Sequence, residues 1–344
     1  MKRLIIFVTK LLILLKHGYD LKQRFSLWVE EYLFFPNFFQ KILALCLLPF
    51  TLMYMLIIIL KRTLAKPINF GVPIISVGNL VVGGSGKTPM TIFLAKNKEH
   101  VAVILRGFGR ASKGLFVISY QGKIIENVST SGDEAMLIAK SLPKATVIVS
   151  ENRIEAILKA KELGCKIIFL DDGFSKYNIA KFDILLRPKE EPTNVFCLPS
   201  GGYREPKMMY TMANLVLQEG IDFQRLVTYK HQGNSVSVLP DTLLLLTAIS
   251  KPKRLLEFLP SSVKLIAFED HHLFTQEEIN DILHEYKEYA IITTPKDMVK
   301  LEQFNLTNLY VMDLELQLMP HVNFEAMDFY IQNSVVSAQY SEAI

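Results

Sequence analysis

The sequence predicts an α/β protein with a three-layer α/β/α domain, a second smaller α/β domain and N-terminal membrane-associated helices. Three observations predict this. Short β-branched apolar runs alternate with helical patterns from about residue 66 to 333, which favours a largely parallel, doubly wound sheet. A polar stretch interrupts the alternation near residue 222, and an apolar segment without charges precedes residue 61.

The composition argues against nucleic acid as a partner. The chain of 344 residues has a net charge of only +4, with 50% hydrophobic residues. Its mean hydropathy of +0.25 is high for a soluble enzyme. Basic and aromatic residues do not interleave in the manner of RNA-binding segments, so no nucleic acid is expected. Cys46, Cys165 and Cys197 lack metal-ligand spacing, which predicts reduced thiols in a reducing compartment.

The first 65 residues are expected to form a hydrophobic, membrane-associated region. Residues 1–22 combine apolar runs with basic residues. A signal peptide is one interpretation, but no small-residue cleavage site follows. Because Lys10 divides the apolar run, a helix in the membrane interface fits better than a span. A helix packed on the protein is the alternative.

A second apolar segment, residues 42–60, contains no charged side chain. Its length is close to the roughly 20 residues of a membrane span, and Pro49 is expected to kink it. Lys61 and Arg62 follow, which would place the rest of a spanning chain in the cytoplasm. The segment is expected to span the membrane or to dip into it from one face. A buried helix of a soluble protein is the alternative.

A glycine-rich loop follows the strand predicted over residues 72–77. Strand, glycine loop, Gly-Lys-Thr and helix form the order of a P-loop, so the first domain is expected to be P-loop NTPase-like. Lys87 would reach the β- and γ-phosphates of a nucleotide, and Thr88 would ligate Mg²⁺. Val81 stands where the strict pattern has glycine, and a glycine turn that binds nothing is the alternative. The candidate nucleotide-binding residues are Gly83, Gly84, Ser85, Gly86, Lys87, Thr88 and Pro89.

Polar motifs follow other predicted strands, at the sheet edge where ligands of doubly wound folds collect. Arg106 and Arg110 flank two glycines after the strand predicted over residues 101–105. They predict an anion-binding loop or a solvated turn. Asp133 precedes an apolar helical pattern, either as its N-cap or as a general base.

Asp171 and Asp172 follow the strand predicted over residues 166–170. A carboxylate at that place suits Mg²⁺ in the Walker-B arrangement, opposite the P-loop threonine. A capping turn is the alternative. Further along, Arg204 and Glu205 lie in a loop. The planar guanidinium of Arg204 suits a phosphate on a substrate, whereas a surface ion pair is the alternative.

The domain boundaries are expected near residues 66 and 223. The first α/β domain would cover residues 66–222, and the second residues 223–333. The stretch over residues 219–235 is expected to be a polar connection, and residues 334–344 a polar tail. In the second domain, Asp270, His271 and His272 follow a predicted strand. No further ligand has metal-site spacing, so a histidine beside a carboxylate favours acid–base chemistry. An ordinary loop residue is the alternative.

Seven motifs in order, GNLVVGGSGKTP, LRGFGR, GDEA, DDGF, LPSGGYREP, FEDHH and TTPKD, resemble those of the tetraacyldisaccharide 4′-kinases, the lipid A 4′-kinases of Gram-negative bacteria. The resemblance runs from about residue 50 to 314, and this family does not use glycine at the place of Val81. It implies transfer of the γ-phosphate of ATP, with Mg²⁺, to the 4′-hydroxyl of a tetraacylated glucosamine disaccharide 1-phosphate. This lipid A precursor would become lipid IVA. The resemblance also implies a place at the cytoplasmic face of the bacterial inner membrane, and an active site between two α/β domains.

The resemblance implies roles for individual residues. Asp133 looks like the base that activates the sugar hydroxyl. His271 looks like its partner from the second domain, oriented or charged by Asp270, with His272 as the alternative partner. Lys87 and Thr88 would hold phosphates and Mg²⁺, and the acidic pair Asp171 and Asp172 would lie near the metal. Arg204 and Glu205 match the loop that meets the lipid headgroup, and the candidate substrate-binding residues are Arg106, Arg110, Arg204 and Glu205.

Two other functions stay open at this point. One is a membrane-anchored P-loop NTPase that acts as a switch and makes no lipid product. The other is a degenerate binding protein. A switch needs no base and no partner histidine, so the GDEA and FEDHH motifs favour the kinase. The sequence indicates neither the oligomeric state nor the acyl-chain preference.

Overall fold

The computed structural model describes residues 25, 28–83, 86–249 and 252–341. The chain forms two compact units. The first unit takes its described residues from Met1–Ala65, Leu80–Ser85 and Arg187–Met212. The second takes them from Lys66–Asn79, Gly86–Leu186 and Ala213–Ile344. The predicted boundaries at residues 66 and 223 stay a prediction.

The first unit contains two apolar helices, α2 (Phe38–Cys46) and α3 (Leu48–Leu64), and the 3₁₀ helix η1 (Lys207–Met212). The segment expected over residues 42–60 is divided between α2 and α3, which are bent by 58° at their junction. Pro49 lies in the first turn of α3, where its missing N–H is tolerated. In the described part of the chain no single helix passes as a membrane span, whereas this bent pair passes by length and composition. Residues 1–22 lie outside the described residues.

Two hydrogen bonds and an ion pair tie α3 to the loop over residues 187–212 within the first unit. The buried Thr51 hydroxyl donates to Ser200 Oγ at 2.8 Å. The Tyr54 hydroxyl donates to the backbone oxygen of Arg204 at 2.8 Å. Arg62 at the end of α3 lies 3.9 Å from Glu205. The helices therefore form one folded unit with the loop that carries the predicted headgroup contacts.

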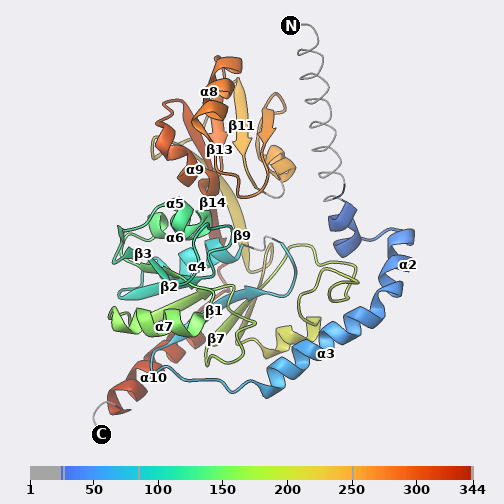
Figure 1. Cartoon of the computed structure of the whole chain (residues 1–344), viewed down its shortest axis with the longest axis vertical. Helices are drawn as coiled ribbons and strands as arrows, with labels where there is room; N and C mark the ends of the chain where they lie inside the picture. The colour runs from blue at the N-terminus through green and yellow to red at the C-terminus, as the bar shows by residue number, and fades with distance from the viewer. Residues whose placement is uncertain (1–24, 26–27, 84–85, 250–251, 342–344) are drawn as a thin grey trace. The chain divides into compact units, whose positions relative to one another are not determined.

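An eight-stranded sheet organises the larger unit, in the order β4-β3-β5-β2-β6-β1-β7-β8. Figure 1 labels its strands β1, β2, β3 and β7. The strands β5, β2, β6, β1 and β7 run parallel, whereas β3 is antiparallel to β5. The bounds are β1 (Ile74–Asn79), β2 (Val101–Leu105), β3 (Phe116–Tyr120), β4 (Lys123–Ile124), β5 (Thr146–Val149), β6 (Ile167–Asp171), β7 (Phe182–Arg187) and β8 (Leu215–Gln218).

Helices cover both faces of this sheet, because its central strands are apolar on both sides. Met90 of α4 (Lys87–Ala95), Ile138 of α6 (Asp133–Ser141) and Met327 of α10 (Glu325–Ser341) share one core with Val77. The other face packs against α7 (Arg153–Glu162), through residues such as Ile157. The short α5 (Val128–Ser131) precedes α6. This arrangement confirms the predicted three layers.

A second sheet of six strands has the order β10-β9-β14-β13-β11-β12. The strands β14, β13, β11 and β12 are parallel, and β9 and β10 are antiparallel additions. The bounds are β9 (Phe223–His231), β10 (Asn234–Val236), β11 (Leu243–Thr247), β12 (Lys264–Ala267), β13 (Ala290–Thr293) and β14 (Leu309–Leu318). Its other elements are η2 (Pro252–Phe258), α8 (Gln276–Glu285), α9 (Pro295–Leu301) and η3 (Glu302–Phe304). The two sheets together confirm the predicted α/β class.

The expectation of a polar connection over residues 219–235 is wrong. Phe223–His231 forms the strand β9, paired antiparallel with β14 along its whole length. Phe223 packs in the core of the first sheet, whereas Val227 packs against the core of the second. The β9–β14 ribbon therefore extends from one core to the other. Most residues of β9 are half-buried, and polar and apolar side chains are mixed along the strand, so its average hydrophobicity is low.

The helix α10 brings the end of the chain back to the first sheet. It continues past Ser334 to Ser341, across the residues expected to form a polar tail. The Tyr330 hydroxyl accepts a bond from the backbone N–H of Ile74 at 3.4 Å, and Asp328 pairs with Lys98 at 2.9 Å. The first sheet is therefore completed by residues from the far end of the sequence.

Candidate active site

The end of the P-loop lies at the carboxyl end of β1. Gly86 has a left-handed backbone (φ +79°) and forms the N-cap of α4, a conformation that favours glycine. The Lys87 ammonium donates to Asn79 Oδ1 at 3.1 Å and lies 3.8 Å from Asp172 Oδ1. Pro89 lies in the first turn of α4. Gly83 also has a positive φ, +99°, whereas Gly84 and Ser85 lie outside the described residues.

Thr88 and the acidic pair lie together at this edge, since β6 neighbours β1 in the sheet. The Thr88 hydroxyl donates to Asp171 Oδ2 at 2.9 Å. Burial raises the pKa of Asp171 to about 6, with a further contribution from the charge of Glu134 and opposition from Lys87. The other oxygen of Asp171, Oδ1, is buried and has no hydrogen-bond partner among the described residues.

The oxygen atoms of Thr88 and Asp171 are ligands that suit a hard cation such as Mg²⁺. Mg²⁺ typically takes one or two carboxylates together with substrate phosphates and water. Asp171 would supply its unpartnered oxygen and Thr88 its hydroxyl, while Asp172 lies beside them with φ +56°. The described residues contain no group of three or more His, Cys, Asp or Glu side chains arranged as a metal cluster. The site therefore suits a cation that arrives with a nucleotide.

The second centre of the site is a pair formed by Asp133 and His271. Asp133 is buried and is the first residue of α6. Gly132 is the N-cap, so the N-cap interpretation of Asp133 is wrong. Nδ1 of His271 donates to the carboxylate, at 3.0 Å from both of its oxygens. The structure thus brings together the two predicted catalytic residues from the two sheets.

Each partner changes the proton affinity of the other. Burial raises the pKa of Asp133, but the hydrogen bond from His271 and the charge of Lys296 outweigh it, and the pKa is lowered overall. The hydrogen bond to Asp133 raises the pKa of His271, with burial and the charge of Lys296 in opposition. Asp133 is therefore held as a carboxylate, and His271 is a stronger base than a free imidazole.

Close backbone packing fixes the position of the His271 ring. His271 has φ +65°, and its N–H donates to the backbone oxygen of Ala248 at 3.2 Å. A Cβ atom on Gly109 would lie 2.9 Å from Cγ and Nδ1 of the imidazole, so only glycine fits there. The Phe108 ring lies 5.2 Å from the imidazole, centroid to centroid. The predicted Arg-Gly-Phe-Gly-Arg loop therefore packs against the catalytic pair.

Helix α9 contributes two lysines that sequence reasoning missed. Lys296 Nζ lies 3.7 Å from Asp133 Oδ2 and 3.4 Å from Asp270 Oδ1. Lys300 is buried, with its ammonium 2.7 Å from Asp297 Oδ1 and 3.8 Å from Asp133 Oδ2. Asp297 in turn accepts from the Thr247 hydroxyl at 2.6 Å. The only signal in the sequence is the Thr-Thr-Pro-Lys-Asp motif at the end of a predicted strand.

The two neighbouring histidines have different partners. Nε2 of His272 lies 3.0 and 3.1 Å from the two carboxylate oxygens of Glu278, and its ring stacks on Phe268. Glu278 also completes the capping box of α8. His272 therefore helps to fix the start of α8, and His271 is the histidine that contacts Asp133.

The four predicted substrate-binding residues are divided between the two compact units. The Arg110 guanidinium is almost fully buried and pairs with Glu151 at 2.6 Å. Arg106 is exposed on the same loop. Arg204 and Glu205 belong to the other compact unit, where Glu205 is buried near Arg62. The substrate contacts of all four stay a prediction.

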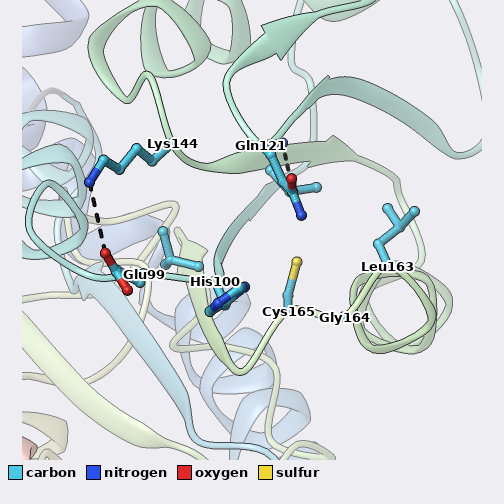
Figure 2. Close-up of a pocket in the computed structure, with 9 residues that line it drawn as sticks. Glu99, His100, Gln121, Lys144, Leu163, Gly164 and Cys165 are labelled. Carbon is cyan, nitrogen blue, oxygen red and sulfur yellow. Dashed lines mark hydrogen bonds and ion pairs between the residues drawn. The ribbon is translucent and has the colours of Figure 1, made fainter.

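A shallow pocket of about 340 Å³ lies elsewhere, at the amino ends of β2 and β5 (Figure 2). Its lining includes His100, Gln121 and the buried Cys165. An ion pair between Lys144 and Glu99 at 3.8 Å closes one side. Since Asp171 ends β6 at the opposite edge of the sheet, this pocket is separate from the candidate active site.

The arrangement is suited to phosphoryl transfer to a hydroxyl group. That reaction needs positioned phosphates, neutralised charge and a group that accepts the hydroxyl proton. In this arrangement Lys87 and Thr88 could position the phosphates, Asp171 could hold a cation that neutralises charge, and the Asp133–His271 pair could accept the proton.

The chain is similar to known kinases over most of its length. The family of tetraacyldisaccharide-1-P 4′-kinases (LpxK) matches residues 43–331. A tetraacyldisaccharide 4′-kinase of Aliarcobacter butzleri is 66% identical over 313 residues, which is 91% of this chain and 99% of the relative. One from Helicobacter pylori is 45% identical over 305 residues, 88% of this chain and 95% of the relative. A crystal structure of LpxK from Aquifex aeolicus in complex with ATP superposes with a TM-score of 0.70 at 29% identity, covering 85% of this chain and 99% of that one.

Proposed function

This chain belongs to the tetraacyldisaccharide-1-phosphate 4′-kinase family, and from that membership we propose that it transfers the γ-phosphate of ATP to the 4′-hydroxyl of a tetraacylated glucosamine disaccharide 1-phosphate. The product is lipid IVA, an intermediate of lipid A biosynthesis. The observation that carries the proposal is the Asp133–His271 pair. A nucleotide switch needs no such pair, whereas a kinase needs a group that accepts a proton from its acceptor hydroxyl.

The contacts of the pair support a division of roles that differs from the one expected from the sequence. Both oxygens of Asp133 face Nδ1 of His271, and one also faces Lys296 and Lys300. Asp133 is thus surrounded by cationic groups and has little tendency to take up a proton. Nε2 of His271 is the ring nitrogen not used by Asp133. We assign proton acceptance from the 4′-hydroxyl to His271 Nε2, with Asp133 fixing the ring and stabilising its charged form.

ATP binding is supported by the Aquifex aeolicus relative, which was crystallised with ATP. In this chain, Lys87 would neutralise the β- and γ-phosphates from the start of α4. Mg²⁺ is part of the proposal, since Thr88 and Asp171 offer the hydroxyl and carboxylate oxygens that suit it. Held there, Mg²⁺ would neutralise the negative charge that develops during transfer.

The acceptor implies a membrane surface as a partner. A tetraacylated sugar keeps its acyl chains in a bilayer, so the enzyme must act at that surface. The helices α2 and α3 carry many exposed apolar side chains, including Phe38, Phe39, Phe50, Leu52, Met53 and Leu56. Exposed apolar surface of this kind is typical of interfacial helices. We propose the cytoplasmic face of the bacterial inner membrane as the location, where ATP is available.

The direct test is an assay with purified protein, ATP, Mg²⁺ and the disaccharide 1-phosphate dispersed in detergent. Mass spectrometry should detect a product heavier by one phosphate. An acceptor analogue without the 4′-hydroxyl should give no product. Lys87→Ala should lower product formation by orders of magnitude. Hydrolysis of ATP without any phosphorylated sugar would contradict the proposal and support the switch.

A further inference from the structure

We propose that Lys296 is a positioning residue of the transfer reaction, whose ammonium group holds Asp133 as a carboxylate and keeps Nε2 of His271 free of a proton until the substrate hydroxyl supplies one. The inference rests on the proposed function, because it concerns the base of that reaction. It concerns a side chain of α9, on the second sheet, that acts on a carboxylate of α6, on the first.

The ammonium group of Lys296 lies at the centre of the charged groups around the pair. Its Nζ is 3.7 Å from Asp133 Oδ2, 3.4 Å from Asp270 Oδ1 and 3.9 Å from Glu134 Oε1. It is also 3.4 Å from Nε2 of His271. Three carboxylates and the catalytic nitrogen therefore share one cation.

The direction of these contacts decides which proton state of His271 is favoured. Nδ1 donates to the Asp133 carboxylate, which only accepts. Lys296 carries only donors, so Nε2 meets it as an acceptor, through the lone pair that would otherwise take a proton. A proton on Nε2 would lie close to this ammonium group, with Asp270 Oδ2 at 3.7 Å as the opposing carboxylate. Lys296 therefore favours the neutral ring whose Nε2 is ready to accept a proton.

Lys296 opposes the effect of the acidic groups around His271. Asp133 and Asp270 both raise the pKa of His271, whereas the charge of Lys296 lowers it. Glu134 of α6 and Lys300 of α9 act from further out, through Lys296 and Asp133. Without Lys296, the imidazole would face two carboxylates and would carry a proton over more of the pH range.

The position of Lys296 is unfavourable for the helix that carries it. It is the second residue of α9, after Pro295, and a cation in the first turn of a helix opposes the helix dipole. Burial also lowers its pKa, but the charges of Asp133, Asp270 and Glu134 outweigh burial and raise it overall. A residue placed against a local preference at a site of this kind points to function.

An ion pair away from His271 also joins α6 to the segment that follows α9. Lys140 of α6 pairs with Glu302 of η3, which comes directly after α9. The Lys140–Glu302 pair is not among the contacts of His271. It supplies a control in which an ion pair between these segments is lost and the charge beside His271 is kept.

The test compares Lys296→Met, which removes the charge, with Lys296→Arg, which keeps it, and with the control Lys140→Met. Two quantities are measured on each full-length protein. One is kcat/KM for sugar phosphorylation as a function of pH. The other is the titration midpoint of the His271 imidazole by NMR, assigned with the His271→Gln variant. The NMR measurement needs no substrate.

We expect the acid limb of the kcat/KM profile and the NMR midpoint to move to higher pH in Lys296→Met. The loss of kcat/KM should be roughly tenfold greater at about pH 6 than at about pH 8.5. Lys296→Arg should restore most of the shift, and Lys140→Met should show none.

An unchanged NMR midpoint in Lys296→Met would overturn the inference, as would an equal loss of kcat/KM at every pH. If the wild type makes no phosphorylated sugar, the proposed function fails. The NMR titration still decides whether Lys296 controls the proton of His271, so the two failures are distinguishable.

Discussion

The Thr88 hydroxyl donates a 2.9 Å hydrogen bond to Oδ2 of Asp171 and joins the first turn of α4 to the last residue of β6. The bond follows from the strand order, because β1 and β6 are neighbours and their carboxyl ends meet at one edge. Two oxygen ligands of the proposed Mg²⁺ are thus held together before any nucleotide binds. Such pre-organisation lowers the cost of positioning the metal.

Thr88→Val should therefore lower kcat by about 100-fold or more, because it removes the hydroxyl at nearly constant volume. Thr88→Ser keeps the hydroxyl and should retain most of the activity. The measurement is sugar phosphorylation at increasing Mg²⁺. Equal losses in Thr88→Val and Thr88→Ser would mean that the methyl group, and not the hydroxyl, matters.

The two neighbouring histidines should differ in their effect on activity. His271→Ala removes the group that contacts Asp133, and kcat should fall by roughly 100- to 10,000-fold. His272→Ala breaks the contact with Glu278 at the start of α8 and should lower stability slightly, with kcat within about tenfold of wild type. Steady-state kinetics measure kcat of both variants, and thermal melts measure their stability. A large loss of kcat in His272→Ala with a small loss in His271→Ala would mean that His272 is the catalytic histidine.

Gly109→Ala should inactivate the enzyme through a steric effect on His271. The new Cβ would meet the imidazole at 2.9 Å, and a shift of about 1 Å at a catalytic group costs roughly 100-fold in rate. Gly114→Ala is the matched control. Gly114 also has a positive φ, +89°, but its Cβ would meet nothing within 4 Å. The Gly114→Ala variant should lose about 1 kcal/mol of stability through backbone strain and keep a near-normal kcat. Similar kinetics for Gly109→Ala and Gly114→Ala would argue against the clash with His271.

Polar substitutions on α2 and α3 should weaken binding to lipid vesicles. Phe39 and Phe50 are 79% and 57% exposed, and burying each in a bilayer contributes roughly 1.5–3 kcal/mol. Phe39→Ser and Phe50→Ser should each lower vesicle partitioning by roughly tenfold or more. Leu158→Ser, at a 53% exposed site on α7, is the control and should bind normally. Vesicle sedimentation measures this, and equal binding by all three would exclude these helices as the anchor.

The Asp133–His271 pair predicts a pH-dependent contribution to stability. The pKa of His271 is raised from 6.5, so its contribution is complete below about pH 6.5 and is lost as pH rises through the raised value. The pKa of Asp133 is lowered from 3.8, so its contribution is present above about pH 4 and is lost only at lower pH. The Tm difference between wild type and His271→Gln should therefore be largest between about pH 4 and 6.5 and should narrow toward about pH 8.5. A Tm difference that stays constant across this pH range would indicate that the ion pair between Asp133 and protonated His271 does not stabilise the fold.

Much of the fold could be predicted from the sequence, where apolar periodicity and burial agree. Residues 101–105 form the strand expected there, because both faces of the strand are covered and the run is purely apolar. The strand β9 was missed because most of its residues are only half-buried, and polar and apolar side chains are mixed along it. The helix α10 was missed because its contacts are with Ile74 of β1 and with Lys98, just after α4, far away in sequence.

The site also contains residues that local motifs reveal and residues that only the fold brings together. The P-loop end and the acidic pair can be recognised from local motifs. Lys296 and Lys300 act on Asp133 from another sheet, and no spacing along the chain encodes that proximity. Arg110 was expected to contact substrate because it follows a strand with glycines around it. That contact stays a prediction, and the structure adds an ion pair between the guanidinium and Glu151, a partner that only the tertiary fold supplies.

The return of α10 to the first sheet has a consequence for how this protein can be divided. A gene fragment that ends near residue 222 would encode all eight strands of the first sheet but would omit Met327, which fills its core, and Tyr330. The first α/β domain is therefore not a contiguous cassette. A chimera of two relatives should therefore take the strands of the first sheet and the helix α10 from the same parent.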